Sequence, residues 1–452
     1  MGVVALADFG STYTKVTLVD PGEGRALGRG EAPTGIATDL MEGFAAALAR
    51  ARDAAGGAVT VDEQLAVSSA GGGLRVAAIG LVEDLTAAAA RQAALNAGAR
   101  VEAVLSGRLG DEQLDALEAA QPEIVLFAGG TDGGQAELVL DNARRLADRG
   151  TGGNVVVACN AEVAAPAAEL LRASGARVEV AANVMPELGR LEAGGAREAI
   201  LRVFLEHVIG GKGLSASPEF ERMVRMPTPE AVFEATGLLG EAVVIDVGGA
   251  TTDVHSSRVV AAAAPGIEDP LLPPPPTLRT VEGDLGLRAG AAGVVAADAR
   301  WLTEKAGETE PAIRHAVSIR AERPAWVPED AIGLRFDALL ATAAATQALT
   351  RHCGTMLLSG GEGKPPTLVR DGPDLREIPL VLGTGGVFMH RSDGEAILRE
   401  ALERRAAHSL SPRDPRLAID RAYLLASAGL LASADRPAAM RLLERELSFL
   451  RN

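Results

Sequence analysis

The sequence predicts an α/β protein with a two-lobed core and an inserted α/β unit. Two segments far apart in the chain, 7–16 and 245–254, share one pattern. In each, a short apolar run ends in Asp, turns on glycine and returns through small hydroxyl residues into a second apolar run. Between these segments, short apolar runs alternate with stretches rich in Ala, Leu and Arg. Such alternation is typical of a parallel sheet with crossover helices.

The first glycine-rich segment predicts a hairpin that holds a phosphate group. A buried strand brings Asp8 to its end, where a carboxylate is a suitable ligand for Mg²⁺. Gly10 lacks a Cβ atom and lets backbone N–H groups approach phosphate oxygens closely. Ser11 and Thr12 add hydroxyl donors, and Lys15 adds a positive charge for a β- or γ-phosphate.

The second segment repeats this arrangement around Asp246. Its other candidate contacts are two glycines, two hydroxyls and a second carboxylate: Gly248, Gly249, Thr251, Thr252 and Asp253. A single glycine beside Asp often marks an ordinary turn, but two copies in this order disfavour that interpretation. We expect Asp8, Lys15 and Asp246 to act in catalysis, and the two carboxylates to hold Mg²⁺. Two such hairpins facing each other would grip a triphosphate from both sides.

The pair of hairpins resembles the phosphate 1 and phosphate 2 motifs of the actin, heat-shock chaperone and sugar-kinase superfamily. The resemblance implies an actin-like ATPase core of ribonuclease H-like fold that binds ATP and Mg²⁺. It also implies a downstream adenosine motif. The segment 378–388 fits this motif, because its apolar run breaks into Gly383, Gly385 and Gly386. The other glycine-rich segment, 357–363, is interpreted as a hairpin or loop beside the site.

Composition limits the possible function classes. The chain has 452 residues, of which 47% are hydrophobic, and is long enough for more than one domain. A net charge of −16 disfavours nucleic acid as a partner, because phosphate-backbone binding needs a concentrated basic face. Cys159 and Cys353 provide neither a disulfide framework nor a metal spacing, and we expect both to be buried. Without a signal peptide or a long apolar run, a cytoplasmic protein with no membrane contact is expected.

The segment between the hairpins predicts a separate sheet. Its strands are expected at four apolar runs: 101–107, 124–130, 155–160 and 178–183. The predicted domains are a first ATPase lobe, an inserted α/β unit and a second ATPase lobe with C-terminal helices, at 1–79, 80–195 and 196–452. Glycine clusters at 71–73 and 129–134 are either tight turns or contacts for a ligand or a partner. Arg75 either contacts a phosphate or begins a helix.

The segment 282–288 carries two further candidate carboxylates, Glu282 and Asp284, before an Ala-rich helix. In one interpretation they orient a metal-bound water, and Glu282 contacts the nucleotide. In the other they are the acidic residues expected at the start of a helix. The scattered histidines lack the spacing of a metal site.

Five segments together resemble the glutamate mutase accessory family, the MutL family of the methylaspartate mutase cluster. They are DFGSTYTK (8–15), SSAGGGLRVAAIGLV (68–82), FAGGTDGG (127–134), EGDLGLR (282–288) and GTGGV (383–387). The second and third belong to the insert, which actins, heat-shock chaperones and sugar kinases lack. The superfamily's iron–sulfur dehydratase activators are disfavoured, because their interface cysteines have no counterpart in this chain.

The family resemblance implies an ATP-dependent reactivating or chaperone-like factor. Its partner would be an adenosylcobalamin-dependent mutase or aminomutase of the glutamate mutase type, from which damaged cobalamin is released, and the insert would engage that mutase. A small-molecule kinase and an actin-like filament protein are the alternatives.

Overall fold

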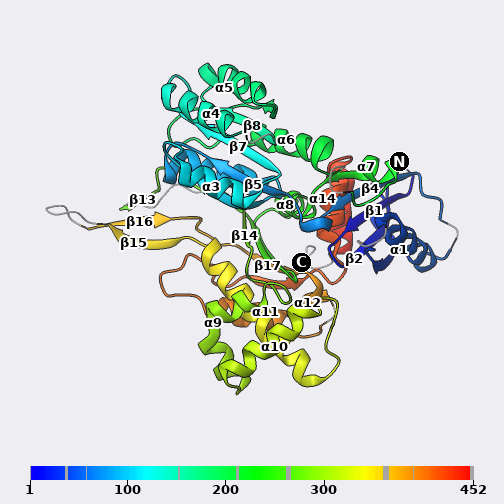
Figure 1. Cartoon of the computed structure of the whole chain (residues 1–452). Coiled ribbons are helices and arrows are strands. Elements are labelled where there is room, and N and C mark those ends of the chain that lie inside the picture. Colours follow the sequence, from blue (N-terminus) through cyan, green and yellow to red (C-terminus); the bar gives the residue numbers. More distant parts are fainter. Residues whose placement is uncertain are drawn as a thin grey trace. The chain divides into compact units, whose positions relative to one another are not determined.

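The computed structural model in Figure 1 describes residues 2–35, 39–57, 59–150, 153–209, 213–260, 266–359, 366–389 and 391–447. The chain forms two compact units. The first consists of Met1–Ala231, Leu271–Pro273 and Gly429–Leu442, and the second of Val232–Pro270, Pro274–Ala428 and Leu443–Asn452.

The first unit begins with a five-stranded mixed sheet in the order β10-β4-β1-β2-β3. Its strands are β1 (Val4–Phe9), β2 (Tyr13–Asp20), β3 (Arg25–Pro33), β4 (Glu63–Ser68) and β10 (Val224–Met226). β1, β2 and β3 are antiparallel neighbours, whereas β4 pairs parallel with both β1 and β10. Helix α1 (Leu40–Ala54) packs against β3 at backbone distance, since a Cβ on Gly30 would lie 2.1 Å from the Ala47 carbonyl oxygen.

The inserted unit is a parallel sheet in the order β6-β5-β7-β8-β9. Its strands are β5 (Arg75–Ile79), β6 (Arg100–Leu105), β7 (Ile124–Gly129), β8 (Asn154–Cys159) and β9 (Arg177–Val180). The intervening helices are α2 (Ala88–Asn96), α3 (Asp111–Ala120), α4 (Glu137–Arg149) and α5 (Ala161–Ala173). This is the doubly wound order of flavodoxin-like sheets. All four predicted strands are present, and β5 is an additional strand that precedes the predicted boundary at 80.

The insert and the first sheet share one hydrophobic core. This core includes Phe9 and Leu18 from the first sheet, Val76 and Val156 from the insert, and Phe204 from the helical segment that follows. That segment contains α6 (Ala193–Val203), η3 (Phe204–Val208) and α7 (Pro218–Met223). Removing the insert would therefore expose apolar surface of the first sheet.

The second unit contains a mixed sheet in the order β14-β12-β11-β17-β18. Its strands are β11 (Ala242–Val247), β12 (Thr252–Ser257), β14 (Thr277–Glu282), β17 (Leu380–Thr384) and β18 (Arg416–Ile419). As in the first sheet, three antiparallel strands are followed by two parallel ones. Two sheets with this connectivity form the ribonuclease H-like core of actin-like ATPases, so the predicted fold class is confirmed.

Helices and a small sheet complete the second unit. The helices are α9 (Ala291–Ala306), α10 (Glu310–Glu322), α11 (Ala331–His352), α12 (Gly386–Met389) and α13 (Gly394–Glu403). The small sheet contains β13 (Ile267–Glu268), β16 (Thr367–Asp371) and β15 (Thr355–Ser359). The glycine-rich segment 357–363 begins inside β15, and its residues 360–363 lie outside the described part of the chain.

Three of the described helices contain residues of both units: α8 (Thr228–Leu238), α14 (Leu424–Ala432) and α15 (Arg436–Glu446). The predicted C-terminal helices are thus α13, α14 and α15, interrupted by the unpredicted strand β18. Both cysteines are buried as expected, and burial raises the pKa of the Cys159 thiol to about 12.

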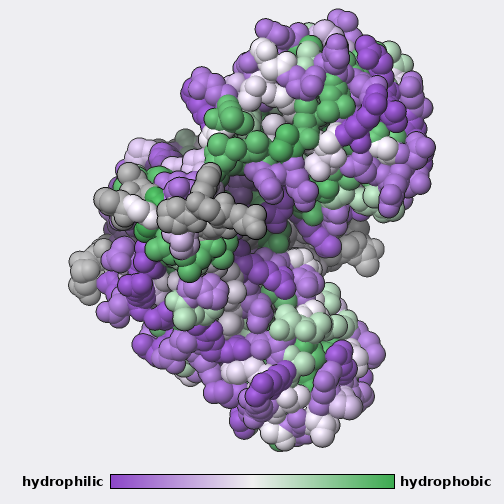
Figure 2. Space-filling view, turned by 90° about the vertical axis from the view of Figure 1, so that its left-hand side faces the viewer, coloured by the Kyte–Doolittle hydropathy of each residue, from purple (hydrophilic) through white to green (hydrophobic). Residues whose placement is uncertain are grey.

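The face drawn in Figure 2 is mostly hydrophilic, with apolar residues in smaller patches. None of the helices in the described ranges is long and apolar enough to cross a membrane.

His352, at the end of α11, is a buried base in the second unit. Its Nδ1 lies 2.9 Å from Thr280 Oγ1, and its Nε2 lies 2.8 Å from Ser256 Oγ. Burial, assisted by the positive charge of Arg258, lowers the pKa of His352 to about 3. The imidazole is therefore neutral in the folded protein at neutral pH.

We expect the free energy of unfolding to decrease as the pH falls from 6.5 toward about 3. In this window the unfolded chain protonates His352 and the folded chain does not, so acid favours unfolding. Urea unfolding at about pH 7.5 and about pH 5 gives the slope of the free energy of unfolding against pH. This slope should be smaller in His352→Asn than in the unsubstituted protein. An unchanged slope would show that His352 does not titrate as its burial requires.

Candidate functional site

Asp8 is held at the carboxyl end of β1 by an ion pair and a hydrogen bond. It lies opposite Lys15 on β2, and its Oδ2 is 4.0 Å from Lys15 Nζ. Its Oδ1 accepts a hydrogen bond of 2.6 Å from the Oγ1 of Thr228, the first residue of α8 and 220 positions away in sequence. Asp8 is only 6% exposed, so these contacts fix the orientation of its carboxylate.

The turn between β1 and β2 is fixed by its backbone. A Cβ on Gly10 would lie 2.7 Å from the Tyr13 carbonyl oxygen, so the turn requires glycine. Thr34 donates to the Gly10 carbonyl at 2.9 Å and to the Thr12 carbonyl at 3.0 Å. Ser11 and Thr12 are exposed. The hairpin is therefore rigid, while the hydroxyl-bearing residues remain accessible to a ligand.

The glycine cluster 71–73 follows β4 beside the first hairpin, because β4 runs parallel to β1 and Ser69 N donates to the Phe9 carbonyl at 3.0 Å. Gly72 and Gly73 have positive φ angles and open space at their Cβ positions. The Oγ of Ser68 is buried without a hydrogen-bond partner among the residues described. This edge of the sheet thus presents open backbone and one unsatisfied hydroxyl.

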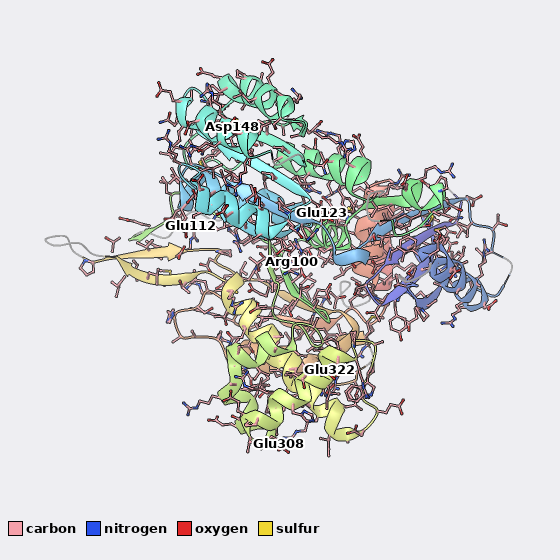
Figure 3. The ribbon with its side chains drawn as sticks, in the orientation of Figure 1. Arg100, Glu112, Glu123, Asp148, Glu308 and Glu322 are labelled. Carbon is pink, nitrogen blue, oxygen red and sulfur yellow. The ribbon has the colours of Figure 1, made fainter. Side chains whose placement is uncertain are left out.

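Arg75 begins strand β5, not a helix. Its backbone N donates to Glu123 Oε2 at 2.9 Å, and its Nη2 lies 3.9 Å from Glu123 Oε1. Both residues lie at the amino-terminal edge of the insert sheet, where Figure 3 labels Glu123. The Arg75 guanidinium thus has a carboxylate partner in the insert, and a phosphate contact of Arg75 stays a prediction.

The other glycine cluster, 129–134, lies in the insert at the carboxyl edge of its sheet. Asp132 accepts hydrogen bonds from Ala161 N at 2.9 Å and from Asn183 Nδ2 at 2.8 Å. Asn160 accepts from Gly133 N at 3.3 Å. These bonds connect the loops after three neighbouring strands, which supports the turn interpretation.

The second hairpin uses its hydroxyls differently from the expectation. Gly248 N donates to the Thr251 carbonyl at 2.9 Å and closes the turn. Thr252 is fully buried, and its Oγ1 donates to the Leu285 carbonyl at 2.5 Å. This hydroxyl hydrogen is thus already donated within the protein, and a phosphate contact of Thr252 stays a prediction. Thr251 donates to Asp253 Oδ2 at 3.2 Å.

Asp253 is part of a buried charge pair. Arg279 on β14 donates to Asp253 Oδ1 from Nε at 2.9 Å and from Nη2 at 2.5 Å. Arg279 is 2% exposed and lies opposite His255, whose pKa burial lowers well below its ordinary value. The pair fastens β12 to β14 directly beneath the second hairpin.

The predicted adenosine motif lies directly beside Asp246, because β17 is parallel to β11 and pairs Thr384 with Asp246. Gly385 has a φ of +100°, and a Cβ on it would lie 2.7 Å from Asp246 Oδ1. Gly386 is exposed, with nothing within 4 Å of its Cβ position. The second hairpin and this glycine turn therefore form one edge of the second unit.

Gly383 has a packing role in this motif. It is buried, and a Cβ on it would lie 3.1 Å from side-chain atoms of Ile419 and Phe388. Gly383 lies inside the sheet, whereas the sequence predicted an open backbone against which the base and ribose of adenosine could lie.

Glu282 and Asp284 are both paired with Arg351 on α11. The Arg351 guanidinium contacts Glu282 Oε2 directly and lies 3.6 Å from Asp284 Oδ1. This ion pairing supports a structural role, and a nucleotide contact of Glu282 stays a prediction.

Within the part of the chain that the structure describes, no three His, Cys, Asp or Glu residues form a metal cluster. Mg²⁺ commonly uses one or two carboxylates together with substrate phosphates and waters. Asp8 in the first unit and Asp246 in the second are each a single carboxylate of this kind, and their role as Mg²⁺ ligands stays a prediction.

Sequence reasoning missed three residues of the site: Thr228, Thr34 and Arg288. Arg288 N donates to the Gly249 carbonyl at 2.7 Å and supports the second hairpin from below. Arg288 ends the segment 282–288, but one arginine shortly after a glycine carries no recognisable pattern. Thr228 and Thr34 reach the first hairpin from other elements and give no local signal.

We expect Gly385→Ala to lower the free energy of unfolding by about 1–3 kcal/mol, because its φ disfavours a side chain and the new Cβ would meet Asp246. Denaturant unfolding measures this loss. Gly386→Ala is the matched control, because its Cβ position is open, and its stability should change little. Equal stabilities for the two variants would contradict this account of Gly385.

The sequence matches the MutL protein family over residues 4–447. A relative described as Protein MutL from Clostridium tetanomorphum is 37% identical over 460 residues, which cover 99% of each chain. Nucleotide-free acetone carboxylase is structurally similar at a TM-score of 0.40 and 14% identity, covering 95% of this chain and 70% of that one. Glycerol dehydratase reactivase follows at 0.35 and 11%, covering 96% and 100%. With its match over nearly the full length, the chain belongs to the MutL protein family.

Proposed function

We propose that this protein is an ATPase that reactivates an adenosylcobalamin-dependent mutase or aminomutase of the glutamate mutase type. ATP hydrolysis would be coupled to release of damaged cobalamin. The observation that carries the proposal is the duplicated site. In each of two sheets with the same connectivity, a strand carries an Asp near its carboxyl end and is followed by a glycine hairpin. Membership of the MutL family supports the mutase as partner.

In this proposal the two hairpins divide the work on the nucleotide. Asp8 and Asp246 hold Mg²⁺ and its waters, and Mg²⁺ supplies charge neutralisation at the phosphates. Ser11, Thr12 and the backbone N–H groups of the hairpins bind phosphate oxygens. Lys15, whose side chain is 26% exposed, stabilises negative charge on the terminal phosphate.

A small-molecule kinase is the alternative function. Such an enzyme needs a carboxylate base near the γ-phosphate. The segment 68–73 beside the first hairpin offers only hydroxyls and glycines around Ala70. Membership of the MutL family is the observation that favours the reactivating ATPase over the kinase.

The insert is the proposed contact surface for the mutase. Its helices carry exposed acidic residues, among them Glu112 on α3 and Asp148 on α4, both labelled in Figure 3. Because the insert shares a core with the sheet that carries Asp8, a rearrangement at the first hairpin reaches the insert through packed side chains.

ATP with Mg²⁺ should raise the thermal unfolding temperature, because a ligand that binds only the folded state stabilises it. Asp246→Asn should leave the fold intact but strongly reduce ATP turnover. Lys15→Ala should slow hydrolysis more than it weakens ADP binding. The measurements are differential scanning fluorimetry and phosphate release. No thermal shift at millimolar nucleotide, or two variants with full turnover, would refute the assignments.

A mutase inactivated by damaged cobalamin should recover with this protein, ATP, Mg²⁺ and fresh adenosylcobalamin, but not without ATP. Charge reversal on the insert, Glu112→Arg with Asp148→Arg, should reduce recovery and leave nucleotide binding unchanged. The matched control reverses two exposed carboxylates of the second unit, Glu308→Arg with Glu322→Arg (Figure 3). Equal recovery by both double variants would place the contact elsewhere. Phosphorylation of a metabolite without any recovery would favour the kinase.

A further inference from the structure

Arg288 is attached to the second hairpin by both its backbone and its side chain. Its N–H donates to the Gly249 carbonyl at 2.7 Å, and the preceding Leu287 donates to the Gly248 carbonyl at 3.0 Å. A Cβ placed on Gly249 would lie 3.5 Å from Arg288 Cγ, so the arginine stem lies directly along the hairpin. The position of the hairpin backbone therefore depends on where Arg288 is held.

Two glycines bring the segment around Arg288 into backbone contact with the hairpin tip. A Cβ on Gly286 would lie 2.4 Å from the carbonyl carbon of Ala250, and one on Gly290 would lie 2.2 Å from its oxygen. Helix α9 begins immediately after Gly290. Protein interiors at this packing density transmit displacements instead of absorbing them. The hairpin and the start of α9 therefore form one rigid piece.

Asp337 on α11 holds the guanidinium of Arg288. Arg288 Nη2 donates to Asp337 Oδ2 at 3.0 Å, and Arg320 Nε on α10 donates to Asp337 Oδ1 at 2.7 Å. The side chains of Arg288, Asp337 and Arg320 are 11%, 7% and 4% exposed. One buried carboxylate thus pairs with two guanidinium groups, one from beneath the hairpin and one from a neighbouring helix.

Arg320 is itself immobilised. Its Nη1 donates to the Ala316 carbonyl at 3.0 Å and its Nη2 to the Gly333 carbonyl at 3.2 Å. Its guanidinium carbon lies 4.7 Å from the centre of the Phe336 ring and 5.4 Å from that of Trp326. With Arg320 fixed, the Asp337 carboxylate cannot rotate away from Arg288.

We infer that Asp337 positions the second hairpin through Arg288, so that the packing of α10 against α11 sets how tightly the hairpin holds nucleotide phosphates. Asp337 is a positioning residue, since it acts through Arg288. The inference rests on the proposed nucleotide function of the hairpin. Its physical basis is charge balance: without the Asp337 charge, two buried guanidinium groups repel each other, and Arg288 can relieve this only by moving.

The test compares Asp337→Asn with Asp298→Asn. The control removes a half-buried ion pair of the second unit, in which Arg404 Nη2 donates to Asp298 Oδ2 at 2.5 Å, and among the described residues no hydrogen bond or ion pair joins Asp298 to the hairpin. Titration with ADP and with adenosine, which lacks phosphates, gives the dissociation constants. Asp337→Asn should weaken ADP binding by about tenfold, as expected when a charge-assisted hydrogen bond is lost. Adenosine binding should not change. Asp298→Asn should leave both constants unchanged.

Hydrogen–deuterium exchange of amides 248–252, measured without nucleotide, tests the positioning independently of binding. Exchange there should be faster in Asp337→Asn than in Asp298→Asn, since only the first variant releases the support of the hairpin. Arg288→Lys retains the charge but cannot bridge to Asp337 in the same geometry, so it should also weaken ADP binding and speed the exchange of amides 248–252. This variant replaces Asp337→Asn in the test if Asp337→Asn does not fold.

Equal ADP affinity and equal exchange in Asp337→Asn and Asp298→Asn would overturn the inference and leave the proposed function intact. If the unsubstituted protein binds no ADP, the proposed function fails. In that case the exchange of 248–252 still decides whether Asp337 positions the hairpin.

Discussion

The parallel pairing of β11 with β17 is the interaction on which the candidate site of the second unit depends. Carboxyl ends of parallel strands meet at one edge of a sheet, and this register places Thr384 opposite Asp246. The turn after β17 consequently begins where the carboxylate of Asp246 lies. β1 and β4 repeat the arrangement in the first unit, where Ser68 is opposite Phe9. One topological rule, used twice, thus brings glycine turns beside both candidate aspartates, Asp8 and Asp246.

Close backbone contact determines what surrounds these edges. Gly385 admits the Asp246 carboxylate at a distance that no side chain would allow, and Gly286 and Gly290 bring the start of α9 against Ala250. A hairpin enclosed in this way has few alternative conformations. A backbone that is already ordered in this way loses little further entropy if a ligand binds to it.

Buried charges fasten the second sheet and its helices to the same edge. The Asp253–Arg279 pair joins β12 to β14, and Asp337 joins α11 to Arg288 and Arg320. Ionic groups at such low exposure are stable only when each carboxylate keeps its partner. The hairpin is therefore mechanically connected to the helices of the second unit.

The sequence by itself determined the features that local patterns encode: the two hairpins, the glycine turn at 383–386, four of the insert strands and the family. Each depends on residues adjacent in the chain, through strand periodicity or the absence of a Cβ atom. Only the tertiary structure decided that Thr228 holds Asp8, that Thr252 faces the interior, that Glu282 pairs with Arg351 and that β5 joins the insert. These outcomes depend on which face of a strand is covered and which distant helix covers it. Such choices are made by packing across the whole unit, and no short segment contains them.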